Sequence, residues 1–163
     1  MSALPTGTVT LLFTDLEGST SLIRVLGDRY GDLLNDQRRL LRAVVEQHGG
    51  SEVDTAGDGF FVRFDGPARG VRFAEACVQA MHGLDLEIRA GVHTGEIGSI
   101  DGKAGGIAVV IGARVAATAG PSEVVVSSTV KDLVAGSGLA FEDAGEHELK
   151  GVPDRWRLYR LIT

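Results

Sequence analysis

The sequence predicts an α+β fold in which helices pack on a mostly antiparallel sheet. Short runs of β-branched and other apolar residues alternate with longer stretches in which apolar residues recur at helical spacing. Their order is strand, helix, two strands, helix and strand, followed by a further helix and strand and a closing hairpin. This order is typical of an α+β sandwich. The 163 residues contain no repeat, low-complexity tract or linker, so we expect a single domain over residues 1–163.

Turn and cap residues divide the first half of the chain into its elements. Ser19 or Thr20 is expected to cap a long first helix, because both side chains accept hydrogen bonds from free N–H groups. The Gly49-Gly50 pair ends this helix, and Pro67 is a favourable first residue for the second one. The expected elements are a strand over 8–13, a helix from 19 or 20 to about 48, two short strands flanking a turn at 57–59, and a helix over 67–82.

The second half of the chain is expected to complete the sheet. Its first helix is apolar apart from Arg114, and Ser127 or Ser128 can cap a short later helix. The expected elements are a strand over 86–95, a helix over 108–119, a strand over 123–126, a short helix ending at 134, and antiparallel strands over 141–149 and 155–161.

Composition limits the classes of partner. The formal net charge of −6 and the pI near 5.2 argue against a nucleic-acid surface, which should be basic. A polyanionic nucleotide can still bind, because metal ions offset local negative charge. The single cysteine, Cys77, cannot form a disulfide bond within the chain. No apolar segment is long enough to span a membrane. We therefore expect a cytoplasmic domain with no signal-peptide pattern and no membrane segment.

Two segments combine an apolar strand with an aspartate at a turn. They are TVTLLFTDLEGST, which carries Asp15, and DTAGDGFFVRF, which carries Asp58. Mg²⁺ and Mn²⁺ favour carboxylate oxygens, so the two aspartates predict a site for hard divalent cations. Ser19 and Thr20 add hydroxyl and N–H donors for an anion where a helix should begin. The alternative is that both aspartates only form turns.

These segments resemble the metal-binding segments of class III adenylyl/guanylyl cyclases. The resemblance continues in the family's order through IRAGVHTGE, GGIAVVIGARVAATAGPSEVVVSS and HELKGVPDRWRLY, and so covers nearly the whole chain. It is strongest to actinobacterial and related cyclase homology domains, which are often fused to hydrolase or regulator domains. The resemblance implies a ferredoxin-like βαββαβ core with an additional C-terminal helix and strands. It also implies a head-to-tail homodimer with two equivalent sites at the interface.

The activity that this resemblance implies is that of an adenylate cyclase. In that reaction the ribose 3′-hydroxyl of ATP attacks the α-phosphate, giving 3′,5′-cyclic AMP and pyrophosphate with the help of two Mg²⁺ or Mn²⁺ ions. By resemblance, Asp15, Asp58 and the carbonyl group of Leu16 bind the ions. The terminal phosphates would meet backbone and hydroxyl groups of four consecutive residues, Glu17, Gly18, Ser19 and Thr20.

Two arginines match arginines of the family. Arg89 corresponds to one that contacts the triphosphate from the subunit that bears the metal ligands. Arg114 corresponds to the catalytic arginine that stabilises charge on the α-phosphate from the other subunit. From residue type alone, Arg89 is equally an exposed strand arginine, and Arg114 a helix side chain that reaches to solvent.

Several positions depart from the family pattern. The asparagine or histidine expected four residues before the arginine is Val110, which cannot hydrogen-bond the ribose. Adenylyl cyclases typically read the base with a lysine and an aspartate. Asp54 and Lys103 stand at these two positions, so the two charges are exchanged. Alternatively, Lys103 is only a solvated loop residue. The late lysine that meets the triphosphate falls at Val152, and Lys150, two residues earlier, would point to the same side of a strand.

These departures leave three functions open. The first is an adenylate cyclase that binds ATP. The second is a guanylyl or relaxed-specificity cyclase, because Asp54 and Lys103 suit the donors and acceptor of guanine. The third is a degenerate domain that binds nucleotide or dimerises for a regulatory partner, fused or separate. The histidines lack metal-ligand spacing and are read as structural or surface residues: His48, His82, His93 and His147.

Overall fold

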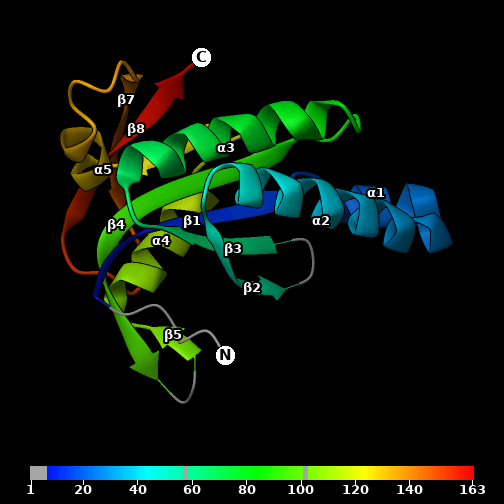
Figure 1. The fold of residues 1–163 in the computed structure, drawn as a ribbon, viewed down its shortest axis with the longest axis horizontal. Helices are drawn as coiled ribbons and strands as arrows, with labels where there is room; N and C mark the ends of the chain where they lie inside the picture. Colours follow the sequence, from blue (N-terminus) through cyan, green and yellow to red (C-terminus); the bar gives the residue numbers. More distant parts are fainter. Residues whose placement is uncertain (1–6, 57–58, 101–102) are drawn as a thin grey trace.

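The computed structural model describes residues 7–56, 59–100 and 103–163 (Figure 1). In chain order the elements are β1 (Gly7–Leu16), α1 (Ser19–Leu26), η1 (Gly27–Arg29), α2 (Tyr30–Gln47), β2 (Ser51–Ala56), β3 (Gly59–Phe64), α3 (Pro67–His82), β4 (Ile88–Ile100), β5 (Lys103–Gly105), α4 (Ile107–Ala117), β6 (Val124–Ser127), α5 (Ser128–Leu133), β7 (Ala140–Glu148) and β8 (Arg155–Ile162). Within these described residues, no helix is long and apolar enough to cross a membrane.

One sheet organises the molecule. The strand order is β2-β3-β1-β4-β6-β8-β7, and β5 pairs with β4 beside this path. The first four strands in this order pair antiparallel, which is the arrangement of a ferredoxin-like βαββαβ core. Strand β6 adds parallel to β4, and β8 and β7 follow antiparallel. The predicted α+β fold, with its C-terminal helix and strands, is confirmed.

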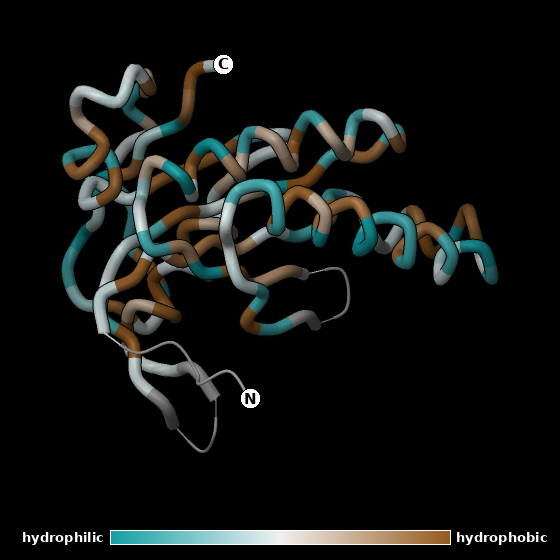
Figure 2. Tube along the Cα trace, in the orientation of Figure 1, coloured by the Kyte–Doolittle hydropathy of each residue, from teal (hydrophilic) through white to brown (hydrophobic). Residues whose placement is uncertain are grey.

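Helices cover both faces of the sheet. Neighbouring residues of β1 enter different cores, because side chains alternate between faces along a strand. Leu12 packs with Leu41 of α2 and Phe73 of α3, whereas Leu11 packs with Ala108 of α4. Helices α2 and α3 therefore lie on one face and α4 on the other, as Figure 1 shows. Hydrophobic and hydrophilic residues alternate along α2 and α3, as expected for helices with one buried side (Figure 2).

The first helix differs from its prediction. The single helix expected from 19 or 20 to about 48 is divided at Gly27, whose φ of 56° and ψ of −123° no helix can accommodate. Helix α1 has no buried residue, so packing does not hold it in line with α2. The expectation that Ser19 or Thr20 caps the helix is also wrong. Gly18 occupies the N-cap position in a left-handed conformation, and no side chain forms a capping hydrogen bond.

The glycine-rich segment after β4 also differs from its prediction. Strand β4 was expected to end at 95 but continues to Ile100, and residues 103–105 pair with it as β5. This hairpin extends away from the rest of the sheet (Figure 1). Lys103 is therefore a strand residue and not a loop residue, because it pairs with Ile100 of β4. The side chain of Lys103 lies outside the described part of the chain.

Helix α4 lies directly on β4 and β1. A Cβ atom at Gly91 would collide with the backbone nitrogen of Ala116, and one at Gly95 would lie 2.8 Å from the Cβ of Ala108. A Cβ at Gly112 would lie 2.6 Å from the ring of Phe13. Three glycines therefore permit this close approach, which fixes α4 relative to the strands.

A buried histidine joins β4 to β6 on the α4 face. His93 is 4% exposed, its Nδ1 lies 2.7 Å from the Ser127 Oγ, and its ring meets Trp156 edge to face. The same hydroxyl accepts a hydrogen bond from the Val130 N–H and caps α5, which confirms Ser127 as a cap. Burial lowers the pKa of His93 to about 4, because the charged ring would lose its hydration.

This lowered pKa predicts a loss of stability in mild acid. The unfolded chain takes up a proton at His93 near pH 6.5, whereas the folded chain resists it down to about pH 4. The free energy of unfolding should therefore fall between pH 6.5 and 4, by up to about 3 kcal/mol from this group. Denaturant titrations should show a smaller loss in His93→Gln than in the wild type.

The matched control is His82→Gln. The His82 Nε2 lies 2.9 Å from the Ser122 Oγ in an exposed pair, so its removal should leave the pH dependence as it is in the wild type. Equal pH slopes for His93→Gln and the wild type would contradict the assignment of this acid sensitivity to His93.

Candidate active site

The core of the candidate site is an ion pair between β1 and β4. Asp15 and Arg89 are direct cross-strand partners in the antiparallel register. The Arg89 Nε donates to the Asp15 Oδ1 at 2.8 Å, and the Nη2 donates to the Oδ2 at 2.6 Å. Two parallel charge-assisted hydrogen bonds give this pair a fixed geometry. The predicted metal ligand and the predicted triphosphate ligand therefore contact each other.

A second carboxylate shares the same guanidinium. The Glu17 Oε2 lies 3.3 Å from the Arg89 Nε, and the Glu17 N–H donates to the Glu87 carbonyl at 2.9 Å, which holds the segment after β1 against the start of β4. The side chain of Arg89 is 29% exposed and that of Asp15 39%. The cluster is thus open to a ligand from solvent.

Alternation along the strands explains why this cluster is uncovered. Asp15 shares a sheet face with Phe13, and Arg89 shares it with Gly91. Helix α4 covers Gly91 with Ala116 and ends at Ala117. The ion pair therefore lies on the α4 face just beyond the helix end, where the sheet has no helical cover.

The donor atoms at this place suit a divalent cation. The Asp15 and Glu17 carboxylates already hold one positive group, the Arg89 guanidinium, which shows that the place attracts cations. The buried Leu16 ends β1, and its backbone carbonyl follows Asp15 directly in the chain. Hard oxygen donors of these two kinds fit Mg²⁺ or Mn²⁺. Asp58, the other predicted ligand, lies outside the described residues, and the remaining described part contains no group of three metal-ligating side chains.

The start of α1 follows the cluster directly. Gly18 precedes the helix with a φ of 69°, and no side chain caps the N–H groups of the first turn, which begins with Ser19 and Thr20. These N–H groups lie immediately after Glu17 in the chain. The arrangement supports the predicted anion-binding role of residues 17–20 without testing it.

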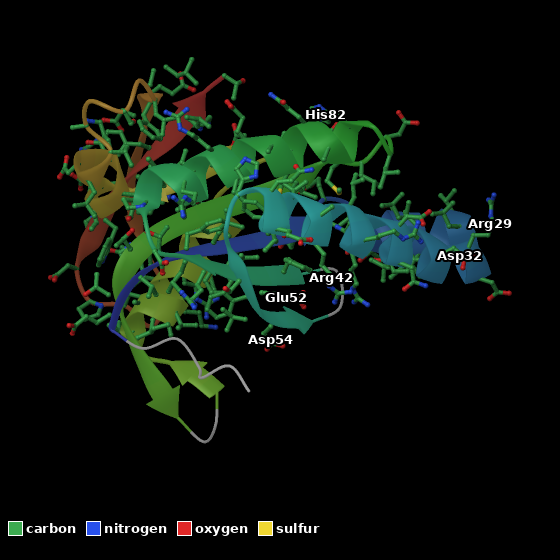
Figure 3. The ribbon with its side chains drawn as sticks, viewed as in Figure 1. Arg29, Asp32, Arg42, Glu52, Asp54 and His82 are labelled. Carbon is green, nitrogen blue, oxygen red and sulfur yellow. The ribbon has the colours of Figure 1, made fainter. Side chains whose placement is uncertain are left out.

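A small hollow on the same face contains Asp54. It has a volume of about 190 Å³ and is lined by residues of β1, β2 and β3, among them Phe13, Asp54 and Phe61. The two phenylalanine rings stack with centroids 4.3 Å apart. Asp54 lies on edge strand β2 (Figure 3), and the register pairs it with Phe61 of β3. Sequence reasoning missed both rings, although alternation in LLFTD and GFFVRF signals that one phenylalanine of each strand turns away from the main core.

The remaining predicted residues lie on α4 and the β7–β8 turn. Ile107, Val110 and Arg114 follow one another at one-turn spacing on the exposed side of α4. The Arg114 Nε donates to the Lys150 carbonyl at 3.3 Å. The strand argument for Lys150 is wrong, because the residue lies in the turn between β7 and β8, where side chains do not alternate. Val152 in the same turn packs on the core below α4.

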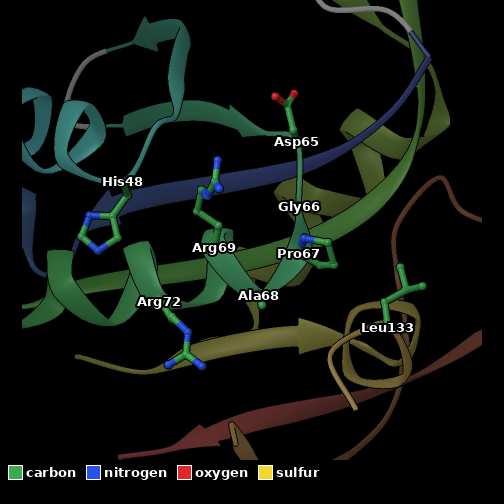
Figure 4. A pocket seen from close by; sticks show the side chains of 8 residues that line it. All are labelled: His48, Asp65, Gly66, Pro67, Ala68, Arg69, Arg72 and Leu133. Carbon is green, nitrogen blue, oxygen red and sulfur yellow. The ribbon is translucent and has the colours of Figure 1, made fainter. Parts of the chain in front are cut away.

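A larger hollow of about 630 Å³ lies elsewhere. It is lined by His48 at the end of α2, by Arg69, Arg72 and other residues at the start of α3, and by Leu133 of α5 (Figure 4). Arg72 donates to the Ser137 carbonyl at 2.7 Å, and the His48 Nδ1 lies 3.0 Å from the Val44 carbonyl. Both groups thus bind backbone of the protein itself. The hollow holds no predicted site residue, so we place the site at Asp15 and Arg89.

Comparison with known proteins decides the family. The model of the adenylate and guanylate cyclase catalytic domain matches residues 1–163. The chain belongs to this cyclase family. The resemblance stated from the sequence is thereby confirmed over the whole chain.

Individual proteins share the sequence or the fold of this chain. An uncharacterised protein of Mycobacterium tuberculosis is 31% identical over 160 residues, which cover 91% of this chain and 54% of that protein. The adenylyl cyclase CyaB from P. aeruginosa has the same fold, with a TM-score of 0.89 and 22% identity over 98% of this chain and 95% of that one. The adenylate/guanylate cyclase/hydrolase from Silicibacter pomeroyi gives a TM-score of 0.81 and 26% identity, with 98% of each chain covered. The chain spans about half the length of this mycobacterial relative.

Proposed function

We propose that this cyclase domain converts ATP into 3′,5′-cyclic AMP and pyrophosphate in the cytoplasm. The observation that carries the proposal is the Asp15–Arg89–Glu17 cluster, which gathers a metal-type carboxylate and a phosphate-type guanidinium at an uncovered sheet end. In the reaction the 3′-oxygen forms a bond to the α-phosphorus, the bond from that phosphorus to the bridging oxygen breaks, and the hydroxyl proton passes to solvent. Pyrophosphate leaves with the electron pair of the broken bond.

The residues of this chain would position the triphosphate and balance its charge. When bound, two Mg²⁺ or Mn²⁺ ions supply polarisation of the 3′-hydroxyl and neutralisation of phosphate charge, with Asp15, Asp58 and the Leu16 carbonyl as their ligands. Residues 17–20 would donate N–H and hydroxyl hydrogen bonds to the terminal phosphates. Arg89 would contact the triphosphate, because a planar guanidinium binds phosphate oxygens in pairs.

A head-to-tail homodimer would complete the site. The exposed side of α4 carries two large apolar side chains, Ile107 at 52% and Val110 at 38% exposure, next to Arg114. Apolar side chains that flank a functional cation support a surface covered by a partner, and two-fold dimers are the commonest symmetric assembly. Arg114 and Lys150 of one subunit would then face Asp15 and Arg89 of the other. A regulatory domain, fused or separate, would act on this assembly.

A guanylyl or relaxed-specificity cyclase is the second candidate. Asp54 lies at the hollow formed by Phe13 and Phe61, where a carboxylate can accept hydrogen bonds from the ring N–H and amino groups of guanine. Lys103 would donate to the 6-oxo group. Val110 and Val152 support the third candidate, a nucleotide-binding or dimerisation domain with little activity, because neither side chain can hydrogen-bond.

Complementation between two inactive variants tests the shared site. Asp15→Ala removes a metal ligand and Arg114→Ala removes the charge at the α-phosphate, so each homodimer should lose at least about 100-fold in turnover. A mixture of the two should regain activity, because one site of each heterodimer carries neither lesion. Cyclic nucleotide formation by the mixture is the measurement.

The control for complementation is a mixture of Asp15→Ala with Asp58→Ala, in which both lesions fall on the same half-site. Each site of that heterodimer still lacks one metal ligand, so this mixture should regain no activity even when subunits exchange. Subunit exchange is followed separately with tagged chains. Absence of recovery in the Asp15/Arg114 mixture, with exchange demonstrated, would place the site within one chain.

Restoring a polar group at position 110 should raise turnover. Val110→Asn adds a hydrogen-bonding amide on the exposed side of α4, one turn before Arg114, where it could contact the ribose. We expect kcat to rise about tenfold with a smaller change in KM, because the contact would act mainly in the transition state. Ile107→Asn, one turn earlier on the same side, is the matched control and should not raise kcat. An equal response of the two variants would show that position 110 does not meet the substrate.

A further inference from the structure

The Asp15–Arg89 pair blocks the place where a cation would bind. Arg89 contacts both carboxylate oxygens of Asp15, at 2.8 and 2.6 Å, and approaches Glu17 to 3.3 Å. Each carboxylate oxygen keeps a further lone pair, but the guanidinium occupies the side on which both oxygens could chelate one ion. Its positive charge also repels a dication brought to the same oxygens. Asp15 cannot serve as a strong metal ligand while this contact persists.

The contact can open without a change of fold. Both side chains are partly exposed, at 29% for Arg89 and 39% for Asp15, so their separation leaves neither charge buried and unpaired. The backbones of β1 and β4 are already paired at these residues, and a rotation of the arginine side chain is enough to release the carboxylate. The ion pair can therefore open and close, and the sheet does not depend on it for stability.

A triphosphate has the chemistry to open it. Phosphate oxygens bind guanidinium groups in pairs, as carboxylates do, and carry more charge. The uncapped N–H groups at the start of α1 follow Glu17 directly and would draw phosphates to this end of the sheet. A phosphate group at this place would compete with Asp15 for Arg89.

We infer that Arg89 keeps Asp15 closed to divalent cations until nucleotide phosphates take over the guanidinium, so that metal and nucleotide bind together. This inference rests on the proposed function of the same site. It makes metal affinity depend on nucleotide, and by thermodynamic reciprocity nucleotide affinity depends on metal to the same degree. The domain without nucleotide should bind Mn²⁺ weakly, although the carboxylates are present.

Mn²⁺ binding to the nucleotide-free domain tests the inference. The electron paramagnetic resonance signal of free Mn²⁺ gives the dissociation constant without any turnover. Arg89→Met should tighten Mn²⁺ binding about tenfold, because it removes two charge-assisted hydrogen bonds from Asp15. Arg89→Lys keeps the charge but not the paired hydrogen bonds, and should tighten binding severalfold.

Arg42→Met controls for the loss of one positive charge. Arg42 forms a comparable two-bond pair with Glu52, at 2.8 and 3.3 Å, on α2 and β2 outside the site (Figure 3). This variant should leave Mn²⁺ affinity unchanged. An equal gain in Mn²⁺ affinity in Arg42→Met and Arg89→Met, with no gain in Arg89→Lys, would show that only the net charge matters. That result would overturn the inference.

A second carboxylate variant separates failure of this inference from failure of the proposed function. Asp15→Asn in the Arg89→Met background should abolish the gain. If Asp15→Asn weakens Mn²⁺ binding while Arg89→Met leaves it unchanged, Asp15 is a metal ligand but Arg89 does not close it. If Asp15→Asn has no effect in either background, Asp15 is not a metal ligand and the proposed site is wrong. Unfolding midpoints near the wild-type value establish that the variants are folded.

Discussion

The antiparallel register between β1 and β4 determines where the chemistry of this domain lies. From Gly7 opposite Ile97 to Leu16 opposite Ile88, this pairing sets Asp15 directly across from Arg89. A shift of β1 by one residue would move Asp15 to the face covered by α2 and α3 and separate it from Arg89. The register is strongly specified, because Leu11 and Leu12 fill different cores on the two faces. The ion pair is thus a consequence of core packing along the same strands.

The close approach of α4 decides what that pair can contact. Gly91, Gly95 and Gly112 let the helix lie directly on the strands, so its last turn stops before Arg89 and leaves the sheet end open. The same approach presents Ile107, Val110 and Arg114 outwards. One helix therefore leaves the metal-binding half of the proposed site uncovered and displays the arginine half to a partner. A single chain carrying two separate halves is the physical basis for proposing the dimer.

The sequence predicted the order of the elements but not the contact between Asp15 and Arg89. Periodicity identified the strands and helices, because strong alternation reflects burial directly. It could not locate the break at Gly27, since nothing in a helical pattern shows that α1 has no fully buried residue. Lys103 in β5 and Lys150 in a turn were misplaced, because strand ends depend on backbone pairing that residue types do not show. The Asp15–Arg89 pair itself arises from a register between residues 74 positions apart, which no local pattern contains.

The most direct measurement is product formation by the purified wild-type domain with Mn²⁺ and either ATP or GTP. We expect cyclic AMP and pyrophosphate in equal amounts, at a slow rate that is higher with Mn²⁺ than with Mg²⁺, and faster turnover of ATP than of GTP. Faster turnover of GTP would assign Asp54 to guanine recognition. Formation of neither cyclic nucleotide, with either metal and with the dimer present, would contradict the claim that this domain is a catalytically active cyclase.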